Sequence, residues 1–355
     1  MTLSILRRDF IKSSAAILCG SILPTHSMKK IAPKAGEIIL GHGSFRYKVI
    51  PNWGILDAGK NPVNDCHEMV EDAKGRLILL TNETKNNVLI YDKSGKLLET
   101  WGHSYPGGHG LSILNEGGEQ YLLICDTARH QVIKTDLKGR EIFKIEYPKE
   151  TGVYDAPNQF LPTETAINPK NGDIYVADGY GANYIIQYDS TGRYIRHFGG
   201  KTSTYSDDKF NCCHGVLVDT RDANNPTLLI TDRVNNSLKR FTLDGKFITR
   251  YHYPGSFICR PVLHGEYILA ACFRSTAESL VGSGYIQILD KNMQVVSTPG
   301  GSAPIYEKGI LQAQHKEDEN HVFIHPHDVY SDSDENIYVP QWASNKTYPI
   351  KLERI

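Results

Sequence analysis

The sequence has almost no excess of charge of either sign and no long charged run. Its 39 lysine and arginine residues balance 40 aspartate and glutamate residues, which leaves a formal net charge of −1. A near-neutral chain has no long-range attraction for nucleic acid or for an anionic membrane, so we expect neither as a partner. With 40% hydrophobic residues in a chain of 355, a large core can be buried.

Apolar runs long enough to cross a membrane are also missing. The apolar stretch 15–23 falls well short of the roughly 20 residues that a spanning helix needs. Arg7 and Arg8 precede this stretch and the polar segment 24–27 follows it, a pattern that resembles a twin-arginine export signal. A membrane anchor is the alternative interpretation.

We therefore divide the chain into an export signal at residues 1–30 and a mature domain at residues 31–355. The protein is then expected to be periplasmic or extracellular, with no membrane span once the signal is removed. Cys19 leaves lipid attachment open, although Leu18 before it is larger than the small residue that such processing prefers.

Sustained helical periodicity is nearly absent, and the chain instead repeats one pattern of strands. Four segments contain a histidine, an apolar run and a turn: CHEMVEDAKGRLILL from Cys66, GHGLSILNEGGEQYLLICD from Gly108, CHGVLVDTRDANNPTLLITD from Cys213 and PHDVYSDSDENIYV from Pro326. Third strands such as VLIYD and YIIQYD follow, each ending at a tight turn with Gly or Asn. Alternating apolar residues bounded by turn residues indicate strands.

Units of this kind start near Cys66, Gly108, Pro162, Cys213, Cys259 and Pro326. Six units of about 40–65 residues with four strands each predict an all-β fold, a six-bladed β-propeller. The last unit has no fourth strand of its own, and an unpaired strand at Ser44–Ile50 precedes the first unit. Pairing of these N- and C-terminal strands would remove two open edges, so we predict that the ring closes across its termini.

Cysteine is scarce, with seven residues in the whole chain. The six that follow the signal would usually suggest disulfides in an exported protein. However, Cys66 and Cys213 occupy the same place in units three apart, on opposite sides of a six-bladed ring, and so do Cys125 and Cys272. The twin-arginine route carries folded proteins, which would fold in a reducing compartment. We therefore expect mostly free, buried thiols.

Histidines recur at one place in alternate units. His109, His214 and His327 start the second, fourth and sixth units, so they would be evenly spaced around the axis of a closed ring. Three converging imidazoles with further positions open are the ligand set of a catalytic zinc. Hydrogen-bonded histidines in a crowded tunnel are the alternative. His67 starts the first unit and breaks the alternation, as an extra ligand, a residue that orients a ligand, or a tunnel histidine.

Several units resemble a known family. LKGREIFKIEY and GDIYVADGYGANYIIQYDSTGRYIRHFG have the look of NHL repeats. GHGLSIL, PTETAINPKNGDIYVADGYGANYIIQYDSTGRYI, CHGVLVD, ITDRVNNSLKRF and PHDVYSDSDENIYV resemble blades of peptidylglycine α-hydroxyglycine amidating lyase. The resemblance covers the second, third, fourth and sixth units well and the first and fifth poorly. It implies zinc on the propeller axis, held by the same three histidines.

The resemblance also implies a structural calcium near the zinc. Its ligands would be the carboxylate directly after the last zinc histidine, here Asp328, and a backbone carbonyl, here that of Leu111. One carboxylate with backbone oxygens suits a hard cation. An aspartate that caps a strand turn is the alternative.

In this family a tyrosine of a DGY motif and an arginine one blade later carry catalysis, and they match Tyr180 and Arg233. A phenol has an ordinary pKa of about 10. A nearby metal cation and guanidinium would lower that pKa, so the resemblance makes Tyr180 the expected general base. Zinc would hold the substrate oxygen as a Lewis acid.

Residues at the ends of second strands are the candidates for substrate binding: Asn82, Glu83, Arg274 and Trp342. The family's first-blade arginine, which grips the peptide carboxylate, has no counterpart, because Leu80–Glu83 stands in its place. We therefore expect a different small substrate, hydroxylated and peptide-like or sugar-like.

The sequence leaves two functions open. One is an exported, zinc-dependent lyase-like enzyme that acts on a small hydroxylated substrate in the propeller mouth. The other is a non-catalytic NHL propeller that binds a peptide, a glycan or a partner protein. A calcium-dependent lactonase-like propeller is a third interpretation, disfavoured because such sites use acidic and amide ligands rather than three histidines.

Overall fold

The structure, a computed structural model, describes residues 36–277 and 282–355. The predicted export signal at residues 1–30, with Cys19, lies outside the described residues and stays a prediction. None of the helices in the described ranges is long and apolar enough to cross a lipid bilayer.

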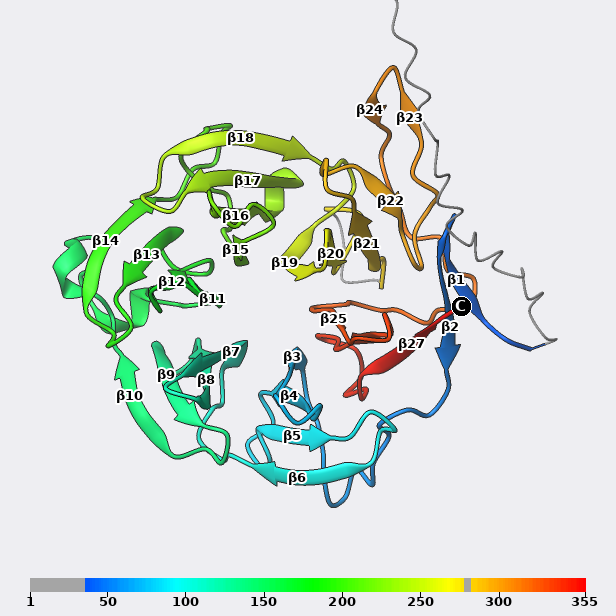
Figure 1. Cartoon of the computed structure of the whole chain (residues 1–355), viewed down its shortest axis with the longest axis horizontal. Helices are drawn as coiled ribbons and strands as arrows, with labels where there is room; N and C mark the ends of the chain where they lie inside the picture. The colour runs from blue at the N-terminus through cyan, green and yellow to red at the C-terminus, as the bar shows by residue number, and fades with distance from the viewer. Residues whose placement is uncertain (1–35, 278–281) are drawn as a thin grey trace, which may run out of the picture. The chain divides into compact units, whose positions relative to one another are not determined.

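Six antiparallel sheets are arranged around one axis, with one strand of each nearest the axis (Figure 1). Blades one and two contain β3 (Cys66–Glu71), β4 (Leu77–Thr81), β5 (Val88–Tyr91) and β6 (Leu97–Trp101), then β7 (Gly108–Glu116), β8 (Glu119–Asp126), β9 (Gln131–Asp136) and β10 (Glu141–Ile145). Blades three and four contain β11 (Glu164–Ile167), β12 (Ile174–Ala177), β13 (Tyr184–Tyr188) and β14 (Tyr194–Gly199), then β15 (Val216–Asp219), β16 (Thr227–Asp232), β17 (Ser237–Thr242) and β18 (Phe247–His252). Blade five contains β19 (Ile258–His264), β20 (Tyr267–Cys272), β21 (Tyr285–Leu289) and β22 (Val295–Ser297). The predicted six-bladed propeller is confirmed.

The sixth blade is built from both ends of the chain. Its strands run in the order β25 (Tyr330–Ser331), β26 (Ile337–Val339), β27 (Ile350–Arg354), β2 (Phe45–Ile50) and β1 (Ile39–His42). Strand β2 pairs with β27 in a register that sets Tyr47 opposite Arg354 and Ile50 opposite Lys351. The predicted closure is therefore confirmed, and β1 adds a fifth strand that the sequence analysis did not anticipate.

Few described residues lie in other regular elements. A short hairpin, β23 (Tyr306–Glu307) and β24 (Ile310–Leu311), follows blade five in the chain and precedes β25 of blade six. The helices are single 3₁₀ turns: η1 (Lys149–Thr151), η2 (Pro157–Gln159) and η3 (Arg233–Asn235).

The turn between the third and fourth strands repeats a side-chain device. In blade one, the Asp92 carboxylate accepts hydrogen bonds from the backbone N–H groups of Ser94 and Lys96, at 2.9 and 3.1 Å. Gly95 completes the turn with a φ of 90°, a left-handed conformation that favours glycine. In blade five Met293 takes this place with a φ of 63°. The D-x-x-G spacing thus positions the outer strand.

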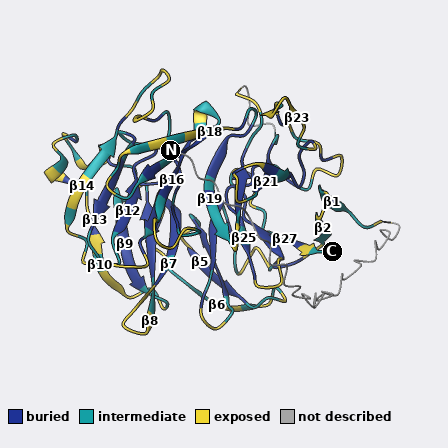
Figure 2. Cartoon of the chain, turned by 45° about the horizontal axis from the view of Figure 1, so that its top comes forward, coloured by how far each residue is buried: buried dark blue, intermediate teal, exposed yellow. Residues whose placement is uncertain are grey.

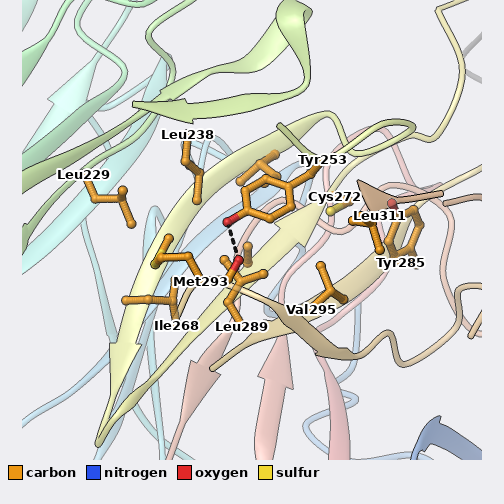
Figure 3. Close-up of a cluster of buried hydrophobic side chains, with 12 residues drawn as sticks. Leu229, Leu238, Tyr253, Ile268, Cys272, Tyr285, Leu289, Met293, Val295 and Leu311 are labelled. Atoms are coloured by element: carbon orange, nitrogen blue, oxygen red, sulfur yellow. Dashed lines mark hydrogen bonds between the residues drawn. The ribbon is translucent and has the colours of Figure 1, made fainter. Parts of the chain in front are cut away.

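Apolar clusters lie between each pair of neighbouring blades. Between blades four and five, Leu229 and Leu238 pack with Ile268, and the Tyr253 hydroxyl donates to the Met293 carbonyl at 2.9 Å (Figure 3). Burial is concentrated in the inner strands, whereas most residues of outer strands such as β6, β10 and β18 are partly or fully exposed (Figure 2). Because cores form only between blades, each blade depends on its neighbours.

All six cysteines after the predicted signal are free, and five of them are buried. The expectation of free thiols is confirmed. Cys66 and Cys213, for example, lie in different interblade cores.

We predict that deletion of all residues up to Ile50 destabilises the whole propeller rather than one blade. The deletion removes β2 and the buried side chains of Leu40, worth about 1.5–3 kcal/mol, and Tyr47, and it leaves β27 paired with β26 alone. Thermal or guanidinium unfolding, followed by circular dichroism, measures the loss. A chain that begins at Gly36 keeps β1 and β2 and is the matched control. An unchanged midpoint in the longer deletion would contradict closure through β2.

Candidate functional site

Four imidazoles meet on the propeller axis. His67 and His109 belong to β3 and β7, and His214 and His327 lie just before β15 and β25. Five pairs of these rings are in contact, with centroids 4.6–5.0 Å apart. Each residue is at most 5% exposed. The structure thus brings together the four histidines predicted as ligands.

Three of these rings are held by the neighbouring blade. The Nδ1 atoms of His109, His214 and His327 lie 2.8, 2.9 and 3.0 Å from the backbone carbonyl oxygens of Thr163, Cys259 and His67. A carbonyl only accepts hydrogen bonds, so Nδ1 carries the proton and Nε2 keeps its lone pair free. Metal-binding histidines are oriented in this way by outer hydrogen bonds.

A glycine follows two of these histidines and brings the blades into contact. A Cβ atom on Gly110 would lie 2.6 Å from the Thr163 carbonyl oxygen, and one on Gly215 would lie 2.4 Å from the Cys259 carbonyl oxygen. These are the same oxygens that accept the hydrogen bonds of His109 and His214. The His-Gly pairs in the sequence therefore position the imidazoles against the next blade.

The six blades place one residue each at this level of the axis: His67, His109, Thr163, His214, Cys259 and His327. The even-numbered blades contribute the anchored imidazoles, and the odd-numbered blades contribute the carbonyls that anchor them. The alternation predicted from the repeat is therefore also an alternation of donor and acceptor.

Two overlapping groups of side chains present nitrogen or sulfur atoms within 4.8 Å of one another: His67, His109 and His327, and His214, Cys259 and His327. Within the described ranges, the Nε2 atom of His327 and the Nδ1 atom of His67 are buried without a hydrogen-bond partner. Buried polar atoms normally have partners, so these two indicate a missing ligand. The donor set fits a transition metal such as zinc.

Burial keeps the imidazoles neutral. It lowers the pKa of His67 to about 3 and holds the pKa values of His109, His214 and His327 well below 6.5, helped in all three by the positive charge of Arg233. Neutral imidazole is the form that binds metal.

Cys259 is a candidate ligand that the sequence analysis missed. Its blade-five segment matches the family poorly, and the cysteine was classed only as a buried thiol. Its place at the start of a unit, equivalent to that of the histidines, was the available signal. Burial raises the pKa of this thiol to about 11, opposed by Arg233. Without a metal it is therefore a neutral thiol at neutral pH.

The groups expected to bind calcium are occupied by a side chain. The Arg260 guanidinium donates to both carboxylate oxygens of Asp328, at 2.7 and 3.2 Å, and lies 3.4 Å from the Leu111 carbonyl oxygen. A calcium ion needs these oxygens at about 2.3–2.6 Å and would be repelled by the guanidinium. The calcium site at Asp328 and Leu111 therefore stays a prediction, and the described contacts of its oxygens are with Arg260.

Tyr180 reaches the histidine cluster from the mouth. The Asp178 carboxylate fixes its loop by accepting hydrogen bonds from the Leu161 N–H and the Tyr154 hydroxyl, both at 2.7 Å. The Tyr180 hydroxyl lies 3.2 Å from Nε2 of His109 and 3.1 Å from Nε2 of His214. Because Tyr180 is 43% exposed, its ring faces the mouth while its hydroxyl faces the buried imidazoles. Among the described residues, Tyr180 is the one whose phenol contacts these two Nε2 atoms.

Arg233 lies beside Tyr180 as predicted. It begins η3 directly after Asp232, whose buried carboxylate pairs with Lys239 and fixes the loop. Its guanidinium carbon is 5.4 Å from the Tyr180 ring centroid. Burial raises the pKa of Tyr180 above 10, and Arg233 only opposes that rise. Arg233 alone therefore does not lower the pKa of Tyr180 below its ordinary value, and the expected base depends on a metal cation as well.

An aromatic and cationic wall continues from Arg233. Phe273 packs against the guanidinium groups of Arg233 and Arg274, at 4.8 and 4.9 Å, and against the Trp342 ring at 6.3 Å. Phe257 lies under Arg274 at 4.6 Å. Two of the predicted substrate-binding residues, Arg274 and Trp342, are therefore part of the same wall as Arg233.

The other two predicted substrate-binding residues, Asn82 and Glu83, are not part of this wall. The Asn82 amide is bonded to the side chains of Asn64 and Asp65, in the segment before β3, at 2.9 and 3.0 Å. The Glu83 carboxylate accepts the backbone N–H of Lys85 at 3.0 Å. No contact between described residues joins Asn82 or Glu83 to the histidines. In the structure they act as loop-fixing residues.

Known proteins with similar sequences include amidating enzymes. The chain is 27% identical over 271 residues to the peptidylglycine alpha-amidating monooxygenase of Rattus norvegicus, covering 75% of this chain and 25% of the rat protein. It is 27% identical over 165 residues to a probable peptidyl-alpha-hydroxyglycine alpha-amidating lyase of Caenorhabditis elegans, covering 46% and 44% of the two chains. It is 26% identical over 196 residues to NHL repeat-containing protein 3 of Mus musculus, covering 52% and 54%. The chain spans about a quarter of the length of the rat relative. No family model matches the chain.

Solved structures share the fold. A streptogramin B lyase superposes with a TM-score of 0.51 and 14% identity, covering 82% of this chain and 94% of that chain. A virginiamycin B lyase from Staphylococcus aureus, in complex with quinupristin, superposes with a TM-score of 0.51 and 13% identity, covering 88% of each chain. The protein is thus a six-bladed β-propeller. Within that class, it resembles the peptidylglycine α-hydroxyglycine amidating lyases.

We predict that replacement of His109, His214 or His327 by alanine removes most of the bound metal and leaves the propeller folded. Each variant removes one anchored Nε2 donor, and the strand pairing does not involve the ring. His67→Ala is expected to weaken metal binding less, because no neighbouring carbonyl orients its Nδ1. Elemental analysis after dialysis measures metal content, and circular dichroism checks the fold.

His103→Ala is the control for these variants, because His103 is exposed and contacts only its own blade. Full metal occupancy in all three single variants would contradict the site.

Proposed function

We propose that the protein is an exported, zinc-dependent lyase-like enzyme that acts on a small hydroxylated substrate at the mouth of the propeller. One observation carries this proposal. Three imidazoles on alternate blades are fixed through Nδ1, and the Tyr180 hydroxyl lies 3.1–3.2 Å from two of their Nε2 atoms. The similarity to amidating lyases supports the reaction class. Export rests on the N-terminal pattern of paired arginines and a short apolar stretch.

The proposed metal ligands are His109, His214 and His327, with His67 as a fourth imidazole. When bound there, zinc supplies a Lewis acid that polarises a substrate hydroxyl. The buried, uncharged cluster favours this because it offers only neutral donors. The other groups of the site act on the substrate itself.

Tyr180 is proposed as the general base. The Tyr180 hydroxyl faces the Nε2 atoms of His109 and His214, and the substrate hydroxyl would be held beside the same atoms. Tyr180 can therefore take the proton of that substrate hydroxyl. Loss of that proton allows the carbon–oxygen bond to become a carbonyl while the bond to the leaving group breaks. The electron pair stays with the leaving group, which takes up a proton. Arg233 would stabilise the phenolate of Tyr180 or the developing oxyanion.

The mouth favours a substrate that differs from a peptidyl α-hydroxyglycine. The position of the family's peptide-gripping arginine is taken by Asn82, which bonds to the segment before β3, and by Glu83, which bonds within its own loop. Cations and flat rings are instead found on blades four to six, as Arg233, Arg274 and Trp342. A small hydroxylated ligand, peptide-like or sugar-like, with a negatively charged group suits that wall.

A non-catalytic NHL propeller that binds a peptide, a glycan or a partner protein is the second candidate. The similarity to an NHL repeat-containing protein favours it. Metal content separates the two: a metal-free protein whose histidine variants behave like the wild type would support the binding module.

We predict that Tyr180→Phe lowers turnover by about 10²–10⁴ while metal content is unchanged, because general-base catalysis is typically worth that much. Arg233→Ala is expected to lower turnover by about 10²–10³, also without loss of metal, because it removes stabilisation of an anion. Steady-state kinetics and elemental analysis on the same samples measure both effects.

Two surface variants serve as controls. Tyr205→Phe changes an exposed phenol, and Arg250→Ala removes a guanidinium that stacks on the Tyr205 ring. Wild-type turnover in Tyr180→Phe would remove this tyrosine from the mechanism.

A peptidyl α-hydroxyglycine is the first substrate to test, and we expect weak or no turnover. The prediction follows from Asn82 and Glu83 at the position of the missing arginine. Release of glyoxylate measures the reaction. Turnover at a kcat/KM of about 10⁴ M⁻¹s⁻¹ or more, the range of efficient enzymes, would show that another group grips the carboxylate.

A further inference from the structure

A second ring of residues follows directly after the histidine ring in all six blades. It consists of Glu68, Gly110, Glu164, Gly215, Arg260 and Asp328, each next in sequence to the residue that its blade places on the axis. This level of the axis therefore contains three acids, two glycines and a single arginine. The similarity to amidating enzymes gives no role to Arg260.

The arginine contacts every acid of the ring. Besides Asp328, Nη1 of Arg260 donates to Glu68 Oε2 at 2.9 Å and to Glu164 Oε2 at 3.0 Å. The acidic side chains are at most 1% exposed and that of Arg260 is 11% exposed. One guanidinium thus joins carboxyl groups from blades one, three and six, and it starts from blade five.

Backbone groups complete the cluster. The Leu111 N–H donates to Glu68 at 2.5 Å, the Met69 N–H donates to Asp328 at 3.0 Å and the Thr165 N–H donates to Glu164 at 2.7 Å. Every acid is therefore oriented by a backbone donor as well as by Arg260. The carboxylates converge on the guanidinium from fixed directions.

The remaining blade makes room for the arginine. A Cβ atom on Gly215 would lie 2.4 Å from Cβ of Arg260 and 2.5 Å from its Cα. Only glycine fits blade four at this place without moving the β19 backbone. All six blades thus contribute to the seat of one guanidinium, either by a contact or by leaving space.

We propose that Arg260 is the protein's own cation at the position where the resemblance implies calcium, so that the propeller is independent of calcium and an emptied cluster binds a divalent cation. The occupied oxygens are those of Asp328 and Leu111, and the carboxylates of Glu68 and Glu164 add two more donors of the kind calcium prefers. A cavity of about 220 Å³, lined in part by Leu111, Thr165 and Arg260, adjoins the cluster.

The test compares Arg260→Ala, which removes the guanidinium and leaves space, with Arg260→Met, which removes the charge and keeps most of the volume. Both variants and the wild type are loaded with zinc, freed of calcium and unfolded thermally with and without calcium. Magnesium is the control ion. Bound calcium is counted by equilibrium dialysis.

We expect the wild type to bind no calcium at this position and to keep its Tm when calcium is added. Arg260→Ala should lose roughly 5–15 °C in Tm without calcium, because buried carboxylates lose their partner. Calcium should restore much of that loss, with one ion bound per chain. Arg260→Met should be destabilised similarly and gain little from calcium. The double variant Arg260→Ala/Asp328→Asn should not be rescued.

Two results would overturn the proposal. One is a wild-type protein that binds calcium and loses it in Asp328→Asn. The other is a folded Arg260→Ala variant that gains neither bound calcium nor stability. If Arg260→Ala does not fold, the wild type and Asp328→Asn still decide whether calcium binds beside the arginine. None of these readouts depends on enzymatic activity.

Discussion

The antiparallel pairing of β2 with β27 is the constraint on which the rest of the molecule depends. A propeller blade has no core of its own here, because the apolar clusters lie between neighbouring blades. Each cluster requires the blade on either side, so the sixth interface exists only when the ring is closed. Closure also fixes the inner strands around one axis. Without it, residues from blades two, four and six would not face one another.

The axis uses this closed geometry at two levels. At the first level, polar groups alternate between imidazoles that donate and carbonyls that accept, which leaves three oriented Nε2 atoms. At the second level, Arg260 gathers three buried carboxyl groups. A buried charge cluster is costly unless its members are paired. Here each acid accepts hydrogen bonds from Arg260 and from a backbone N–H, and burial raises the pKa values of Glu68 and Asp328, which reduces the negative charge that one guanidinium must balance. The second level thus supports the histidines of the first, because Glu68 and Asp328 are the next residues after His67 and His327.

Much of this arrangement could be predicted from the sequence because the repeat has a fixed phase. Histidines at one place in four of the six units predicted the cluster on the axis, and the unpaired Ser44–Ile50 predicted closure. Contacts between blades could not be predicted in the same way. The segment around Cys259 and Arg260 departs from the repeat, so neither the thiol near the histidines nor the guanidinium at the calcium position was expected. For Asn82 and Glu83, position at a strand end did not reveal that nearby loop residues, Asp65 and Lys85, bond to their polar groups. That depends on where the loop turns, which the pattern of apolar residues does not determine.

The way the sixth blade is assembled has a consequence for the order of events during synthesis. Strand β2 is made before every blade, and its partner β27 is made after every other described strand. The interblade cores can form one after another as the chain emerges, but the first and last blades meet only at the end. Until then the growing protein is an open arc with two unpaired strand edges. The histidine cluster, which needs blades from both ends of the arc, is assembled in the same final step. A metal that needs the complete cluster could therefore bind only to the finished ring.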